Sequence, residues 1–240
     1  MFKLRLWQIG IFSCLAISSK CIYKESARTQ SKPIEPTTEF KQNNSDEFLY
    51  SLYNIKDGFS IPAAETDLIN KSGGNATYGE ITQEGVNLLI DKIKPTKDDV
   101  FYDLGSGQGK MTTHIYLKTP VKKSVGIELS KSRYEGSKKI FKDLMNQNLL
   151  DPKRKLEFYN KNIKDVPLKD ATIIYLSSLC FPQKLIQDIT NNILRDTKGK
   201  LYLITFSSLP KDSGFTLQEK VTIPMTWSKS SPLYIYTKNN

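Results

Sequence analysis

The stretch Val100-Phe-Tyr-Asp-Leu-Gly-Ser-Gly-Gln-Gly-Lys110 decides the fold of this chain. Its apolar start predicts a buried strand, its alternating glycines predict a tight turn, and Met111 onward predicts a helix. Because glycine has no Cβ, Gly105, Gly107 and Gly109 let the backbone turn sharply and approach a ligand closely. A strand that leads through such a turn into a helix also directs free N–H groups into the crevice beyond the strand. The stretch therefore predicts a nucleotide-type binding site in an α/β fold.

The spacing of the glycines distinguishes between several kinds of nucleotide-binding turn. A dinucleotide-binding turn reads G-x-G-x-x-G, whereas this chain reads G-x-G-x-G, and a phosphate-binding loop would need glycine in place of Leu104. Asp103 can face the positively charged methionine part of S-adenosylmethionine (SAM), and Glu128 in the next strand-like run can accept hydrogen bonds from both ribose hydroxyls. We therefore predict SAM as the ligand. The alternative, a plain turn with incidental glycines, does not account for the two acids.

The length and composition limit the number of domains and the classes of function that the chain can have. The 240 residues suffice for one sizeable domain with an appendage. Lys and Arg number 35 against 25 Asp and Glu, and this net charge of +10 suits a nucleic-acid or other anionic partner. The lysines are scattered, so an ordinary solvated surface explains the charge equally well. The single histidine, His114, and the three cysteines argue against zinc chemistry, Ser-His-Asp hydrolysis and a disulfide framework, and we predict no metal.

Residues 1–21 read as a leader or signal-like segment. Lys3 and Arg5 precede a short apolar stretch over 6–18, which is typical of a secretory signal and too short for a spanning helix. The residues before Cys21 match neither a clean cleavage site nor a standard lipoprotein box. The expectation is a protein that is exported, membrane-attached or secreted, with an intracellular protein carrying an N-terminal extension as the alternative.

The remaining chain divides into three predicted parts. Residues 22–45 are polar and are predicted to form a linker. Residues 46–93 are predicted to form a small helical lobe with helices over 46–53 and 82–93. Residues 94–240 are predicted to form the SAM-binding domain.

Within that last part, strand and helix patterns alternate. The run over 171–176 is continuously apolar, as a strand buried on both faces should be. Two final strands, over 215–223 and 233–236, are predicted to pair antiparallel. The pattern indicates a doubly wound, Rossmann-like α/β sheet with a C-terminal antiparallel hairpin. The other strands are expected over 100–104, 124–129, 156–160, 171–177 and 199–206, and the helices over 109–117, 131–148 and 182–194.

Several motifs occur together in a fixed order. They are Thr77-Tyr-Gly-Glu80, Phe101-Tyr-Asp-Leu-Gly-Ser-Gly-Gln-Gly109, Gly126-Ile-Glu128, Ile174-Tyr-Leu-Ser-Ser-Leu-Cys-Phe-Pro182 and Trp227…Pro232-Leu-Tyr-Ile-Tyr236. With them the chain resembles the non-SET histone lysine methyltransferases, the disruptor-of-telomeric-silencing family of class I SAM-dependent methyltransferases. The resemblance covers roughly residues 76–238. Many methyltransferases share the glycine motif, whereas Tyr-Gly-Glu upstream of it is much more specific.

The resemblance implies how the methionine part of SAM would be held. Tyr78 and its neighbours, Glu80 among them, would close over the cofactor as a loop. Asp103 and Gly105 would hold the methionine part, and Gly107 and Gly109 are the further cofactor-binding residues of the turn. Lys110 departs from the family, which has a neutral amide-type residue there, and a positive charge beside the sulfonium is unfavourable unless it points away.

The resemblance also implies contacts to the adenosine part. Glu128 would bind the ribose. Asn162 stands where the family usually has an acid that meets the adenine amino group, and it can still accept that hydrogen bond. Ile163 stands at the aromatic position that flanks adenine and would supply an apolar contact.

The implied catalytic residues are Tyr78, Ser177, Phe181 and Tyr234. Phe181 and Tyr234 match aromatic positions that line the family's lysine channel, although ordinary core packing would also explain them. The family has paired asparagines beside the transferred methyl group, whereas this chain has Ser177 and Ser178, whose hydroxyls reach less far.

The predicted function is SAM-dependent N-methylation of a protein lysine, with a histone or another basic protein as acceptor and with nucleosome contact through the positive charge. The reaction depends mainly on positioning, and a narrow aromatic channel favours the deprotonated amine by desolvation. One alternative is a methyltransferase for a non-histone protein, a small molecule or RNA. Another is a SAM-binding protein without catalysis, which Ser177, Ser178 and Lys110 keep open.

Overall fold

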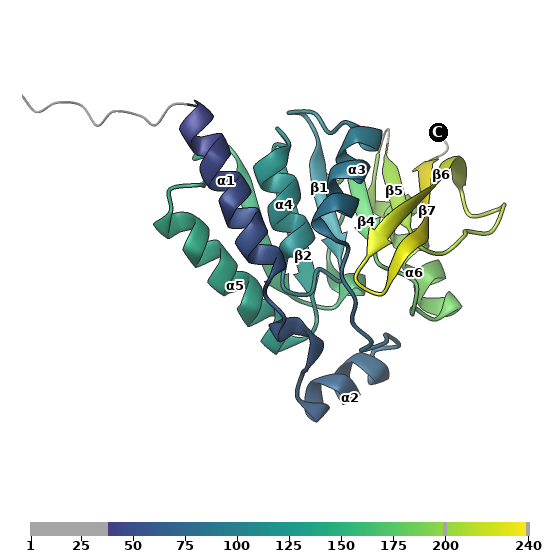
Figure 1. Cartoon of the computed structure of the whole chain (residues 1–240). Helices are drawn as coiled ribbons and strands as arrows, with labels where there is room; N and C mark the ends of the chain where they lie inside the picture. The colour runs from purple at the N-terminus through teal and green to yellow at the C-terminus, as the bar shows by residue number, and fades with distance from the viewer. Residues whose placement is uncertain (1–37, 199–200, 239–240) are drawn as a thin grey trace, which may run out of the picture. The chain divides into compact units, whose positions relative to one another are not determined.

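The computed structural model describes residues 38–198 and 201–238. A seven-stranded sheet runs through it in the order β3-β2-β1-β4-β5-β7-β6 (Figure 1). The pairs from β3 to β5 are parallel, and β7 lies antiparallel between β5 and β6. This order confirms the predicted Rossmann-like sheet and its C-terminal antiparallel hairpin. The strands are β1 (Val100–Leu104), β2 (Lys123–Glu128), β3 (Lys155–Asn160), β4 (Ile173–Leu176), β5 (Tyr202–Thr205), β6 (Phe215–Met225) and β7 (Ser228–Lys238).

Helices cover both faces of the sheet. The α-helices are α1 (Thr38–Tyr53), α2 (Ala63–Lys71), α3 (Gln83–Ile93), α4 (Lys110–Lys118), α5 (Lys131–Asn146) and α6 (Gln183–Asp196), and two 3₁₀ turns are η1 (Asp57–Phe59) and η2 (Ile163–Asp165). Leu89 of α3 and Ile115 of α4 pack with one side of the sheet, whereas Ile189 of α6 packs with the other. A third apolar cluster joins α1 and α5 next to β3, so the helices ahead of β1 pack on the sheet domain.

The central strand β1 brings the site residues together. All five of its residues are buried, as its apolar sequence predicts. Its Asp103 pairs in register with Gly126 of β2 and with Tyr175 of β4. Since parallel strands end at the same edge of a sheet, the residues that follow β1, β2 and β4 meet there.

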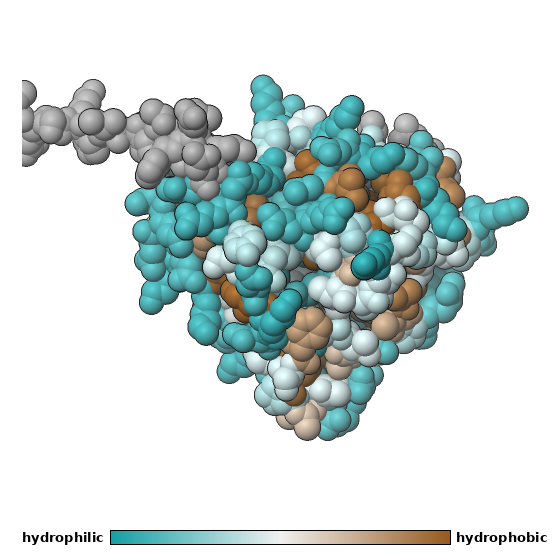
Figure 2. Space-filling model, viewed as in Figure 1, coloured by the Kyte–Doolittle hydropathy of each residue, from teal (hydrophilic) through white to brown (hydrophobic). Residues whose placement is uncertain are grey.

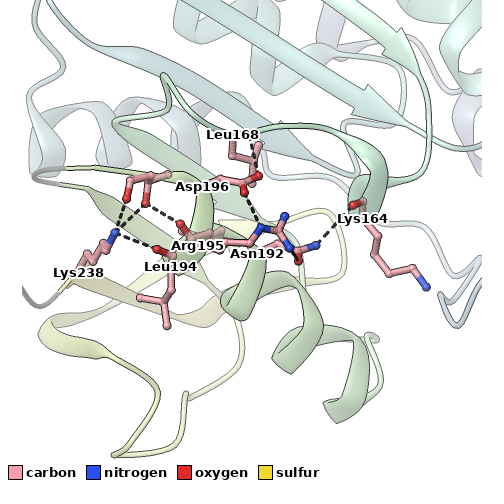
Figure 3. Close-up of polar contacts among 9 residues, drawn as sticks. Lys164, Leu168, Asn192, Leu194, Arg195, Asp196 and Lys238 are labelled. Atoms are coloured by element: carbon pink, nitrogen blue, oxygen red, sulfur yellow. Dashed lines mark hydrogen bonds and ion pairs between the residues drawn. The ribbon is translucent and has the colours of Figure 1, made fainter.

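Polar contacts anchor the C-terminal end of α6 (Figure 3). The Lys238 ammonium at the end of β7 donates to the carbonyl of Leu194 at 3.2 Å. Asp196 accepts from the backbone N–H of Leu168 at 3.4 Å, and Asn192 donates to the carbonyl of Lys164 in η2 at 3.5 Å. These contacts tie α6 to the hairpin and to η2.

The structure corrects the sequence reading ahead of β1. α1 begins at Thr38, so residues 38–45 belong to a helix and not to the predicted linker. Phe48, Leu49 and Leu52 of this helix are buried, and their packing stabilises a segment whose polar start resembles a linker. α2 was not predicted, because its nine residues carry only a weak helical pattern. The leader over 1–21 and the linker up to residue 37 lie outside the described residues.

The surface adds two observations. Hydrophilic residues cover most of the face shown in Figure 2, and apolar residues appear there in small separate patches. None of the helices in the described part of the chain is long and apolar enough to cross a membrane.

Candidate active site

The glycine turn after β1 has the conformation that its sequence predicts. Gly105, Gly107 and Gly109 have φ angles of 91°, 55° and 78°, which favour glycine. The N–H groups of Gly105 and Ser106 both donate to the carbonyl of Ile127 in β2, at 2.9 and 3.0 Å. The turn is thereby fixed at the edge of the sheet where β1 and β2 end.

A pocket lies beside this turn and gathers most of the predicted cofactor residues. Residues that line it include Tyr78, Gly105, Glu128, Asn162, Ile163, Ser177 and Phe181. A second, smaller pocket adjoins it, and its lining includes Glu80, Asp103, Ser106, Lys110 and Tyr175. Tyr78, Gly79, Gly105 and Ser177 line both pockets, so the two form one continuous site.

Tyr78 is held against the glycine turn. A Cβ on Gly107 would lie 2.6 Å from the Tyr78 ring, and one on Gly58 would lie 2.8 Å from it. The ring of Phe59 meets the Tyr78 ring edge-on at 5.2 Å. Gly107 therefore contributes to the site through close packing, whereas Gly109 packs against Phe158.

Glu80 links three parts of the site. Its carboxylate accepts from the Tyr78 hydroxyl at 2.7 Å and from the Lys110 ammonium at 2.8 Å. Its backbone N–H donates to the Thr226 hydroxyl, and its carbonyl accepts from the Thr226 N–H. Lys110 also donates to the carbonyl of Ile55 at 2.5 Å. The positive charge that seemed out of place in the sequence is thus directed at a carboxylate.

Asp103 is a buried acid that lines the smaller pocket. It is 2 % exposed and accepts a hydrogen bond from Thr112 at 3.1 Å. Burial raises its pKa to about 7, and the negative charge of Glu128 acts in the same direction. Within the described residues, the nearby buried hydroxyl of Ser106 has no hydrogen-bond partner. A ligand with a positive charge and a polar group would satisfy both.

Glu128 ends β2 and faces the larger pocket. One of its oxygens accepts from the Gly107 N–H at 2.8 Å and the other from the Ser130 N–H at 2.7 Å. Burial raises its pKa, although these N–H groups and the charge of Arg133 oppose the shift. Each carboxylate oxygen has two lone pairs, so Glu128 can accept further hydrogen bonds from ribose hydroxyls.

Asn162 and Ile163 line the larger pocket. The Asn162 side-chain oxygen accepts from the Lys164 N–H at 3.0 Å and caps η2. This cap fixes the position of both residues, for which the resemblance predicts contacts with the adenine.

The two serines after β4 have different environments. Ser177 lines both pockets. Ser178 is fully buried, contacts the Thr205 hydroxyl, and accepts from the N–H groups of Phe206 and Ser207, both at 3.1 Å. Ser178 therefore joins the ends of β4 and β5, and only Ser177 faces the site.

A row of aromatic rings leads from the smaller pocket to the surface. Tyr175 lines that pocket, and its ring lies 6.1 Å from the ring of Phe206. Phe206 lies 6.2 Å from Trp227, which is 43 % exposed. A Cβ on Gly79 would lie 2.2 Å from the Trp227 ring, so the Tyr-Gly-Glu segment packs directly on this tryptophan.

Phe181 and Tyr234, which the resemblance assigns to a lysine channel, do not belong to this row of rings. Phe181 lines the larger pocket beside Gly105. Tyr234 is not among the residues that line either pocket, and its ring stacks on Tyr236 at 6.4 Å. Sequence reasoning did not assign roles to Tyr175, Phe206 or Trp227, although Trp227 belongs to one of the matched motifs.

The sheet order, the glycine turn and the acids near the ends of β1 and β2 define the fold of the class I SAM-dependent methyltransferases. An RNA methyltransferase from Salinibacter ruber, solved with S-adenosyl-L-homocysteine, has the same fold, with a TM-score of 0.52 and 17% identity over 65% of this chain and 90% of its own. Residues 59–233 match the family described as "Histone methylation protein DOT1", and the chain belongs to that family.

Two curated relatives are both named "Histone-lysine N-methyltransferase, H3 lysine-79 specific". The protein from Caenorhabditis elegans is 30% identical over 146 residues, which are 58% of this chain and 15% of that protein. The protein from Candida glabrata is 23% identical over 155 residues, which are 61% of this chain and 24% of that protein. This chain therefore spans less than a quarter of the length of either relative.

Proposed function

We propose that this chain is a SAM-dependent protein-lysine N-methyltransferase. The observation that carries the proposal is the continuity of the site. Most of the predicted SAM residues line two adjoining pockets, and Tyr175 of the smaller pocket begins a row of aromatic rings that ends at the exposed Trp227. Membership of the DOT1 family supports the same function.

The residues present suit SAM. The buried Asp103 carboxylate would bind the positively charged methionine end, and the unpartnered Ser106 hydroxyl would complete its contacts. Glu128 would accept from the ribose hydroxyls, while Asn162 and Ile163 would contact the adenine. When bound, SAM supplies a methyl group that its sulfonium has already activated.

The chain's own task is then to position a neutral amine. We infer that the lysine side chain enters along Trp227, Phe206 and Tyr175, and that the Ser177 hydroxyl orients its nitrogen. Apolar and aromatic walls disfavour a charged ammonium, so they lower the pKa of the entering amine and favour its neutral form. Correct alignment then supplies most of the rate, and no general base is required.

We propose a histone as the methyl acceptor. The names of the two curated relatives support this choice, as does a net charge of +10 that suits the DNA of a nucleosome. A non-histone protein, a small molecule or RNA would need the same cofactor but a different acceptor path.

The test is incubation of the full chain with methyl-labelled SAM and separate pools of histones, nucleosomes, ribosomes and cell lysate. Label on histones or nucleosomes is expected, and Asp103→Ala and Glu128→Ala should abolish it. Label confined to RNA would overturn the lysine assignment. Binding of SAM without transfer to any pool would overturn catalysis.

A further inference from the structure

Arg133 stands out among the residues that line the larger pocket, because neither the motifs nor the proposed reaction gives it a role. It lies in the first turn of α5, is 5 % exposed, and its N–H donates to the helix-capping Ser130 hydroxyl at 3.2 Å. α5 begins three residues after Glu128, the last residue of β2. Arg133 thus lies on the helix that directly follows the strand carrying the Glu128 carboxylate.

The guanidinium of Arg133 reaches across to the segment that covers the pocket. Its Nε donates to the carbonyl of Gly58 at 3.1 Å, and its Nη2 donates to the carbonyl of Ala76 at 3.0 Å. Its central carbon lies 4.3 Å from the centre of the Tyr78 ring. One buried side chain therefore fixes η1, the loop before Tyr78 and Tyr78 itself.

These contacts fix the position of the Tyr78 ring. Its ring fills the space above Gly58 and Gly107, where even a Cβ would be too close. The planar guanidinium of Arg133 lies against the Tyr78 ring, while its N–H groups donate to the carbonyls of Gly58 and Ala76. An unpaired buried guanidinium would be costly, so the closed position of the loop and the position of Arg133 depend on each other.

We infer that Arg133 is a positioning residue that holds the Tyr78 loop closed over the cofactor pocket before SAM binds. Preorganisation of this kind improves affinity, because less ordering has to occur during binding. The inference rests on the proposed function for the identity of the ligand. Arg133 thereby sets how tightly the ligand is held.

The chain offers a matched control in Arg154. Its guanidinium lies 4.4 Å from the centre of the Tyr116 ring and donates to the carbonyls of Val121 and Thr119, both at 2.8 Å. It therefore makes the same kind of contacts as Arg133. None of these residues lines either pocket of the site.

The experiment measures the Kd of SAM by calorimetry and the thermal midpoint for the full chain and for Arg133→Met, Arg133→Lys and Arg154→Met. Loss of preorganisation is expected to raise the Kd about tenfold or more in Arg133→Met. In Arg133→Lys the rise should be smaller, because the ammonium keeps its charge near the ring but lacks the guanidinium fork. Arg154→Met should lower the midpoint and leave the Kd within about twofold of wild type.

The outcomes separate this inference from the proposed function. If wild type binds SAM and both Arg133 variants bind it equally well, Arg133 is only structural and the inference is overturned. The same holds if Arg154→Met weakens binding as much as Arg133→Met. If Arg133→Met does not fold, the Kd of SAM for Arg133→Lys alone tests the inference, and a Kd equal to that of wild type overturns it. A wild-type chain that does not bind SAM overturns the proposed function and this inference together.

Discussion

The Lys110 ammonium lies 2.8 Å from the Glu80 carboxylate, and both side chains are buried. Glu80 comes from the Tyr-Gly-Glu segment, and Lys110 begins the helix that follows the glycine turn. The ion pair therefore joins the covering segment to the cofactor turn. It also explains how the site accommodates a lysine beside a ligand that carries a sulfonium.

Removal of one partner of this pair should destabilise the protein strongly. Lys110→Met leaves Glu80 buried and unpaired, and we expect it to lower the free energy of unfolding by about 3–5 kcal/mol. Lys110→Met with Glu80→Gln removes both charges and keeps an acceptor for the Tyr78 hydroxyl. Urea unfolding of the two single variants and the double variant measures the coupling. Additive losses would show that the two residues do not interact as an ion pair.

Asp103→Asn should make the ligand-free protein more stable. The pKa of Asp103 is about 7 when folded and 3.8 in its ordinary state, so the carboxyl favours folding while protonated. That stability is lost as the pH rises towards 7. Asparagine still accepts from Thr112 and does not ionise, so the gain should be roughly 1–3 kcal/mol larger at pH 8 than at pH 5. Equal gains in urea unfolding at the two pH values would contradict the raised pKa.

The affinity for SAM should depend on the same titration. Only the ionised form of Asp103 attracts the positive methionine end, and this form predominates above a pH of about 7. We expect the Kd to rise as the pH falls below 7, by up to about tenfold per pH unit. Calorimetry from pH 5.5 to pH 8.5 measures this change while circular dichroism checks that the protein stays folded. A Kd that is flat across this range would remove Asp103 from the binding site.

Gly79→Ala tests the proposed lysine path. A Cβ at this position would lie 2.2 Å from the Trp227 ring and must displace it. We expect the KM for the protein acceptor to rise about tenfold or more. Gly136→Ala is the control, because the atoms nearest to its Cβ belong to the flexible side chain of Gln108, at 3.2 Å. If Gly79→Ala methylates its acceptor normally, Trp227 does not guide the lysine.

The sequence predicts the parts of this fold that depend on local patterns. β1 has the bounds expected from its apolar run, and the turn after it has the positive φ angles that its glycines indicate. α1 begins earlier than expected because its burial against α4 and α5 outweighs its polar start. Composition alone therefore mistakes a packed helix for a linker.

The site was predictable only where one motif supplies both the residue and its surroundings. Asp103 and Glu128 were predicted in this way, since Asp103 lies next to the last residue of β1 and Glu128 ends β2, both beside the glycine turn. Arg133 carries no local signal, and its role arises from carbonyls more than fifty residues earlier in the chain. Phe206 likewise gains its role from Tyr175 and Trp227, which lie on different strands or turns. Such contacts require the folded chain.

The most direct measurement is tandem mass spectrometry of nucleosomes after incubation with the full chain and SAM. A mass increase of one or more methyl groups on the ε-nitrogen of a histone lysine is expected, and Asp103→Ala should abolish it. Transfer to another amino acid, to RNA or to a small molecule would contradict the lysine assignment. No transfer to any acceptor by a chain that binds SAM would contradict catalysis itself.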